Sequence, residues 1–116
     1  PLRGALFENW VVTEVLKWRW NRGLPTDLAF YRDARGAEID LVVEKALDPI
    51  ALEVKAGQTA PLDLAARFAA FEALLKAAPI IPRRVERRVV YAGDRRIQIE
   101  GIDVLPWHAL DCVSWA

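Results

Sequence analysis

"EIDLVVEKALDPIALEVK", residues 38–55, predicts two short strands joined by a turn, and this hairpin decides the fold. Apolar side chains alternate along both strands and predict one buried face: Ile39, Leu41 and Val43, then Ile50, Leu52 and Val54. The other face carries Asp40 on the first strand and Glu53 and Lys55 on the second. Because like charges facing each other destabilise a sheet, this polar face requires water or a counter-charge.

The turn predicts how the two strands are paired. With Glu44 opposite Pro49, Asp40 faces Glu53. Two unit charges about 4 Å apart repel by roughly 4 kcal/mol at an effective dielectric constant of about 20. A divalent cation between the oxygens would remove this repulsion, and Mg²⁺ favours one or two carboxylates together with water and a substrate phosphate. We therefore expect a candidate metal site on this face, with Lys55 beside it to orient a nucleophile or stabilise developing charge.

The flanking sequence predicts helices around the hairpin. Residues 5–22 show a helical apolar stripe, and Gly23 and Pro25 give a stop signal. Residues 28–33 are strand-like, residues 61–77 form a second amphipathic helix, and residues 85–93 form a strand. Shorter strands are expected at 96–100 and 102–107, followed by a helical turn at 108–114. Because a helix precedes the strand at 85–93, this strand should run parallel to a hairpin strand. The expected fold class is α/β, a mixed sheet flanked by helices.

Composition limits the possible functions. A length of 116 residues suits one domain, and the 16 basic residues balance the 16 acidic residues, so no overall field attracts nucleic acid or membrane. No apolar run reaches the roughly 20 residues of a membrane span. A single cysteine fits a reducing, cytoplasmic setting. The chain begins at Pro1 and lacks methionine, which predicts a fragment of a longer protein, and it contains no P-loop motif.

An arginine cluster follows the second helix: Arg83, Arg84, Arg87 and Arg88. A run of charge is commonly a solvated face. The alternative is a patch that follows the phosphates of a nucleic acid, because contacts from Arg and Lys to the backbone dominate such affinity.

The polar residues of the hairpin also match a known motif. Asp40, twelve residues and then Glu53-Val54-Lys55 resemble the motif of the PD-(D/E)XK nucleases, whose restriction-endonuclease-like core has the order α-β-β-β-α-β. In the resolvase-like members a glutamate on the first helix completes the metal site, and Glu8 in "LFENWV" occupies that place. The resemblance implies Mg²⁺ or Mn²⁺ held by Glu8, Asp40 and Glu53, with Lys55 as the catalytic lysine.

The sequence around these residues resembles a narrower family. "GALFENWVVTEVLK", "FYRDARGAEIDLVVE", "ALEVKAGQT", "VVYAGD" and "GIDVLPWHAL" are similar to the C-terminal domain of unknown function of prokaryotic AAA+-type ATPases. The similarity extends from Gly4 to Leu110. It implies that residues 1–116 form one nuclease-like domain, the C-terminal fragment of a chain with an upstream ATPase module.

The expected function is Mg²⁺-dependent hydrolysis of DNA phosphodiesters. The alternative is a catalytically inactive module of the same fold that binds DNA or docks on its own ATPase domain. A third reading is a purely structural domain whose carboxylates are solvated. The expected partners are the upstream module and DNA, with no membrane.

Overall fold

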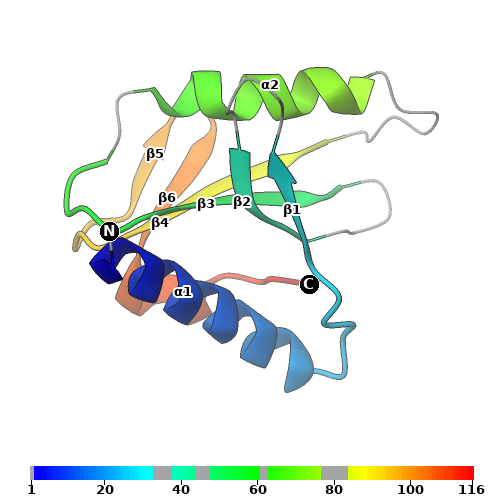
Figure 1. Cartoon of the computed structure of the whole chain (residues 1–116), viewed down its shortest axis with the longest axis vertical. Coiled ribbons are helices and arrows are strands. Elements are labelled where there is room, and N and C mark those ends of the chain that lie inside the picture. Colours follow the sequence, from blue (N-terminus) through cyan, green and yellow to red (C-terminus); the bar gives the residue numbers. More distant parts are fainter. Residues whose placement is uncertain (1, 33–37, 44–47, 61–62, 77–83) are drawn as a thin grey trace.

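The sheet is mixed and has one helix on each face (Figure 1). The computed structural model describes residues 2–32, 38–43, 48–60, 63–76 and 84–116. In chain order the elements are α1 (Leu2–Trp20), β1 (Ala29–Arg32), β2 (Glu38–Val43), β3 (Ile50–Lys55), α2 (Leu64–Lys76), β4 (Glu86–Tyr91), β5 (Ile97–Ile99), β6 (Ile102–Pro106) and the 3₁₀ helix η1 (Trp107–Cys112). The predicted α/β fold class and the order of its elements are confirmed.

The six strands lie in the order β1-β2-β3-β4-β6-β5. β1, β2 and β3 form an antiparallel meander, whereas β4 runs parallel to β3 and to β6. The parallel pairing of β3 and β4, which the intervening helix predicted, is confirmed. β3 and β4 therefore occupy the centre of the sheet, and their middle residues are covered on both faces.

Helix α1 covers one face of the sheet and ends where the sequence predicted. Val11 and Val15 are fully buried against β3. The N–H of Gly23 donates to the carbonyl of Trp20, and the N–H of Leu24 donates to that of Arg19. This pair of bonds, with Gly23 at φ +69°, is the Schellman ending that glycine allows. The helix begins at Leu2 rather than at residue 5, so Gly4 lies in its first turn.

Helix α2 covers the opposite face. Its buried stripe consists of Leu64, Phe68 and Phe71, which pack on Val89 of β4 and Val104 of β6. The predicted start of this helix, at residue 61, lies outside the described residues. Within the described part of the chain, no helix is long and apolar enough to cross a membrane.

The strict alternation expected along β2 is wrong at one residue. Ile39 packs on the α2 side of the sheet together with Val42, whereas Leu41 and Val43 face α1. The β1–β2 register shifts over the same stretch, because Tyr31 pairs with Ile39 but Ala29 pairs with Val42. One extra residue in β2 therefore forms a bulge, which bends the strand and re-aims the side chains between Ile39 and Val42. Asp40 lies in this bulge.

Candidate functional site

The β2–β3 hairpin has the predicted register. Leu41 pairs with Leu52, and Val43 pairs with Ile50, as they must if Asp40 is to lie across from Glu53. The regular pairing ends at Leu41, where the bulge separates the strands. Beyond it, the Asp40 carboxylate accepts the backbone N–H of Val54 at 2.6 Å. A backbone donor of β3 thus holds the Asp40 side chain against the neighbouring strand.

Glu53 is the buried acid of the site. Its side chain is 1% exposed, and its Oε2 lies 3.1 Å from Nη1 of Arg67 and 3.4 Å from Nζ of Lys55. Arg67 comes from α2, and Lys55 ends β3. Buried carboxylates are tolerated when cations and hydrogen bonds compensate for the lost water. Two cations therefore keep this carboxylate in the interior.

Burial raises the pKa of Glu53 from an ordinary value of 4.5 to about 7. This value is the net result of several causes: burial raises the pKa most, the negative charge of Asp40 also raises it, and Lys55 and Arg67 lower it. Asp40 and Glu53 therefore interact electrostatically. A buried acid beside a second acid is the arrangement that perturbs pKa values at functional sites.

Arg67 belongs to the site but was not predicted from the sequence. Its Nη1 binds Glu53, and its Nε lies 3.1 Å from Oδ1 of Asp63, one helical turn earlier. The spacing of four between Asp63 and Arg67 is a signal in the sequence from which a pair on the helix surface could have been inferred. Its neighbour Phe68 faces the sheet, so Arg67 lies at the margin of the buried stripe and reaches the sheet as well.

Glu8, the third predicted ligand, comes from α1. It lies on an exposed part of α1, next to Phe7, which packs on the core cluster that contains Val54. Among the described residues, no three Asp, Glu, His or Cys side chains lie close enough together to hold a metal ion. The printed contacts place two carboxylates, Asp40 and Glu53, at this site. The role of Glu8 as a third metal ligand, which the resemblance implies, stays a prediction.

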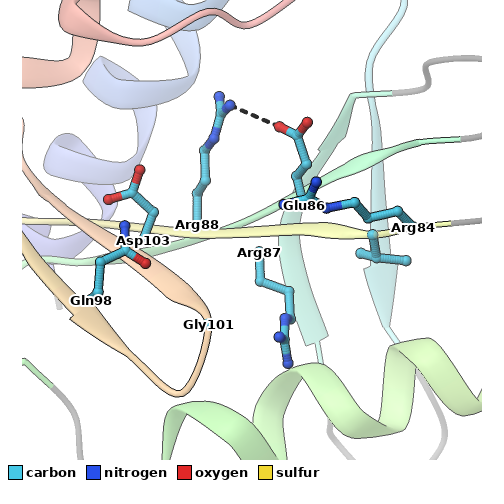
Figure 2. Close-up of a pocket in the computed structure, with 8 residues that line it drawn as sticks. Arg84, Glu86, Arg87, Arg88, Gln98, Gly101 and Asp103 are labelled. Carbon is cyan, nitrogen blue, oxygen red and sulfur yellow. Dashed lines mark hydrogen bonds and ion pairs between the residues drawn. The ribbon is translucent and has the colours of Figure 1, made fainter.

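The arginine cluster does not form one continuous patch. Arg83 lies outside the described residues, and Arg84 is exposed at the start of β4. Arg84 lines a pocket of about 470 Å³ together with Arg87 and Arg88. Figure 2 shows that Arg87 points toward α2, whereas Arg88 points to the opposite side of β4. Adjacent strand residues face opposite sides of a sheet, so Arg87 and Arg88 reach this pocket from opposite sides of β4.

Arg88 has structural partners within the chain. Its Nη2 lies 2.9 Å from the Glu86 carboxylate, its Nη1 donates to the carbonyl of Ser114, and its guanidinium lies 4.7 Å from the centre of the Trp115 ring. These contacts, with a side chain that is 11% exposed, hold the C-terminal segment on β4.

Arg87 is also engaged. Its Nε lies 3.6 Å from the Glu72 carboxylate of α2, and its Nη2 donates to the Glu100 carbonyl at 3.4 Å. The side chain thus connects α2 with the turn between β5 and β6. Among the described arginines of this cluster, Arg84 is the one that is exposed and could contact a phosphate.

The site can bind charge of both signs. Asp40 and Glu53 offer carboxylate oxygens of the kind that Mg²⁺ and Mn²⁺ prefer. Lys55, with a side chain that is 27% exposed, offers an ammonium group at the same place, and Arg67 offers a guanidinium from the other wall. The carboxylates can bind a metal cation, and the neighbouring Lys55 and Arg67 can bind an anion. This combination suits a metal ion with a phosphate bound to it.

Comparison with curated proteins gives no match, and comparison with solved structures gives none either. A family model does match. It is described as a domain of unknown function, DUF4143, and it covers residues 3–110, which include every strand and both long helices. The chain therefore belongs to the DUF4143 family.

Proposed function

We propose that this domain carries a Mg²⁺-dependent nuclease-type site that hydrolyses DNA phosphodiesters. The observation that carries the proposal is the meeting of Asp40, Glu53 and Lys55 at the point where the β2–β3 pairing ends. Their spacing is that of the PD-(D/E)XK motif, and the order of helices and strands agrees with that superfamily. Motif and architecture support the same reading independently.

The donor set fits the proposed metal. Asp40 and Glu53 would hold Mg²⁺ or Mn²⁺, which commonly binds to one or two carboxylates and completes its shell with water and phosphate oxygens. The raised pKa of Glu53 indicates that Lys55 and Arg67 offset the cost of its burial only in part, and a metal cation would lower the remaining cost. When bound, the ion supplies a Lewis acid for the phosphate and makes a bound water more acidic.

The side chains of the chain have separable tasks. Asp40 is pre-positioned by the N–H of Val54, so its carboxylate needs no reorganisation to accept a cation. Lys55 would hydrogen-bond the scissile phosphate and stabilise the negative charge that develops there. Arg67 would remain paired with Asp63 when a metal ion replaces it at Glu53. Glu8, on α1, would be the third carboxylate that binds the ion.

The proposed partner is an ATPase module on the same chain. DUF4143 domains commonly occur with AAA-type ATPases, and the amino-acid sequence of this chain resembles the C-terminal domains of such proteins. Hydrolysis of ATP by that module would then control access of DNA to the site. A domain that binds metal without cleaving DNA remains the second candidate function, favoured by the absence of a third carboxylate among the described residues.

Thermal melting with and without Mn²⁺ tests the metal site. At ten times its Kd, a bound ion adds about 1.4 kcal/mol to the free energy of unfolding. This corresponds to a rise in Tm of about 5 °C for a domain of this size. Asp40→Asn should abolish the rise and, because it removes a charge beside Glu53, should melt at or above the wild-type Tm without metal.

A matched control and a nicking assay complete the experiment. Asp94→Asn, which changes an exposed acid in the turn after β4, should keep the full metal response. Lys55→Ala should keep the metal response but lose DNA cleavage, because a charged lysine has no lone pair for the ion. A wild-type Tm that ignores Mn²⁺ would end the metal-site proposal. A clear shift without cleavage, in a chain that includes its ATPase module, would favour the binding module.

A further inference from the structure

A second pocket lies away from the carboxylate site, where α1 meets η1 (Figure 1). Its volume is about 310 Å³, which is enough for one long side chain. The lining combines aromatic and acidic groups: Trp10, Glu14, Trp107, His108, Leu110 and Asp111. None of these residues takes part in the site of the proposed function.

Two tryptophans form the aromatic walls of this pocket. The ring centres of Trp10 and Trp107 lie 5.7 Å apart, and the ring planes meet at 76°. Although the rings touch each other, Trp10 is still 41% exposed and Trp107 is 42% exposed. In this edge-to-face pair the edge of one ring lies against the face of the other, and the part of each indole that stays exposed offers a π surface that attracts a cation.

Two carboxylates complete the pocket. Glu14 lies one helical turn after Trp10, and Asp111 follows Leu110, which forms the buried floor. Glu14 already contacts Lys17 at 3.3 Å, but the lysine side chain is 64% exposed. Such exposed pairs contribute little, typically about 0.2–1 kcal/mol, and are readily exchanged for a better-placed cation.

Elsewhere in the chain, the cation that lies over a tryptophan ring is a guanidinium. The guanidinium of Arg22 lies 3.6 Å from the centre of the Trp18 ring, and that of Arg88 lies 4.7 Å from the centre of the Trp115 ring. Within the described residues, no cation of the chain itself is placed over Trp10 or Trp107. We propose that this pocket binds the guanidinium of an arginine presented by a partner polypeptide. A planar guanidinium can stack on indole and bind a carboxylate in a bidentate way, which an ammonium cannot do.

The surface next to the pocket indicates that the arginine belongs to a polypeptide. Leu2, Leu6, Trp10 and Glu14 recur every fourth residue and therefore follow one line along α1. Leu2 is 73% exposed and Leu6 is 60% exposed. An apolar strip that leads into an acidic aromatic pocket matches a segment whose apolar residues precede or follow an arginine. Free arginine would leave the strip uncovered.

NMR titration of the ¹⁵N-labelled chain tests this proposal through the five indole N–H signals. N-acetyl-arginine amide should shift the Trp10 and Trp107 signals saturably, with a Kd in the millimolar range, and leave the Trp20 signal in place. A peptide with leucines at the strip spacing before its arginine should bind at least tenfold more tightly than the capped amino acid. Each signal is assigned by a single Trp→Phe variant.

The controls separate charge from apolar packing. Glu14→Gln combined with Asp111→Asn should weaken arginine binding about tenfold, whereas Asp94→Asn should leave it unchanged. The citrulline peptide, which is nearly isosteric but uncharged, should bind at least tenfold more weakly than the arginine peptide. Equal binding of the two peptides would overturn the proposal, as would preference for free arginine, uniform shifts of all five signals, or no shift at 50 mM ligand.

Discussion

The free energy of unfolding is expected to fall by on the order of 3 kcal/mol through Glu53 as the pH rises from about 4.5 to above 7. The pKa of Glu53 is about 7 in the folded chain and 4.5 when the side chain is solvated. Between these values the folded state binds the proton that the unfolded state has released. The contribution of Glu53 to the free energy of unfolding is therefore fully present below pH 4.5. It decreases as the pH rises, until Glu53 is ionised in both the folded and the unfolded state.

Glu53→Gln should remove this pH dependence, because the amide has nearly the same shape and does not titrate. Urea unfolding at pH 5, 6, 7 and 8 gives the slope of stability against pH for each protein. Asp63→Asn is the matched control. Asp63 also contacts Arg67, but that contact lowers the pKa of Asp63 below its ordinary value of 3.8, so Asp63 does not titrate in this window. Its variant should keep the wild-type slope.

The same experiment connects stability with the proposed function. A saturating divalent cation favours the ionised carboxylate, so Mn²⁺ should reduce or reverse the wild-type slope and leave that of Glu53→Gln unchanged. If the wild-type chain is as stable at pH 8 as at pH 5 without metal, Glu53 is solvated. The buried-acid description of the site is then wrong.

Trp115→Ala is expected to lower the free energy of unfolding by about 3–5 kcal/mol, the range found when buried aromatic side chains are truncated. Trp115 is fully buried in the core cluster on the α1 side. Its Nε1 donates to the Leu110 carbonyl at 2.8 Å, and its own carbonyl accepts a bond of 2.7 Å from the buried Arg19. Truncation leaves a cavity and removes the ring over which Arg88 lies.

The exposed Trp20 provides the control for this substitution. Trp20 is 73% exposed, so Trp20→Ala should change stability by no more than about 0.5 kcal/mol. Trp115→Phe should fall between the two, because it fills most of the cavity but leaves the Leu110 carbonyl without its donor. Urea melts at one pH rank the three variants. A loss below 1 kcal/mol for Trp115→Ala would mean that the C-terminal segment is not part of the core.

This result also bears on the arginine cluster. Arg88 contributes to the fold through Trp115, Ser114 and Glu86, so its loss should lower stability rather than weaken a surface contact. Runs of arginine in a sequence do not reveal this difference. Residues 87 and 88 are adjacent in the chain, but β4 turns their side chains to opposite faces, where each finds partners from another element.

The local features of the fold could be predicted from the residues alone. The alternation in residues 38–55 and the length of the turn predicted the register that brings Asp40 to Glu53, because the period of a strand is two and a short turn allows few pairings. The apolar stripes predicted both helices, and Gly23 with Pro25 predicted the end of the first. The crossover through a helix predicted that β4 runs parallel to β3. The first three of these features depend on residues that are close in the chain, and the fourth follows from the general handedness of such crossovers.

The environment of the site could not be predicted in this way, because it depends on how the elements pack. The burial of Glu53, its raised pKa and its contact with Arg67 arise because α2 packs over β3 at a particular distance and rotation. The bulge that moves Ile39 to the other face arises from the pairing of β2 with β1. Periodicity specifies which face of an element is apolar, but contacts between polar side chains of different elements depend on how those elements pack.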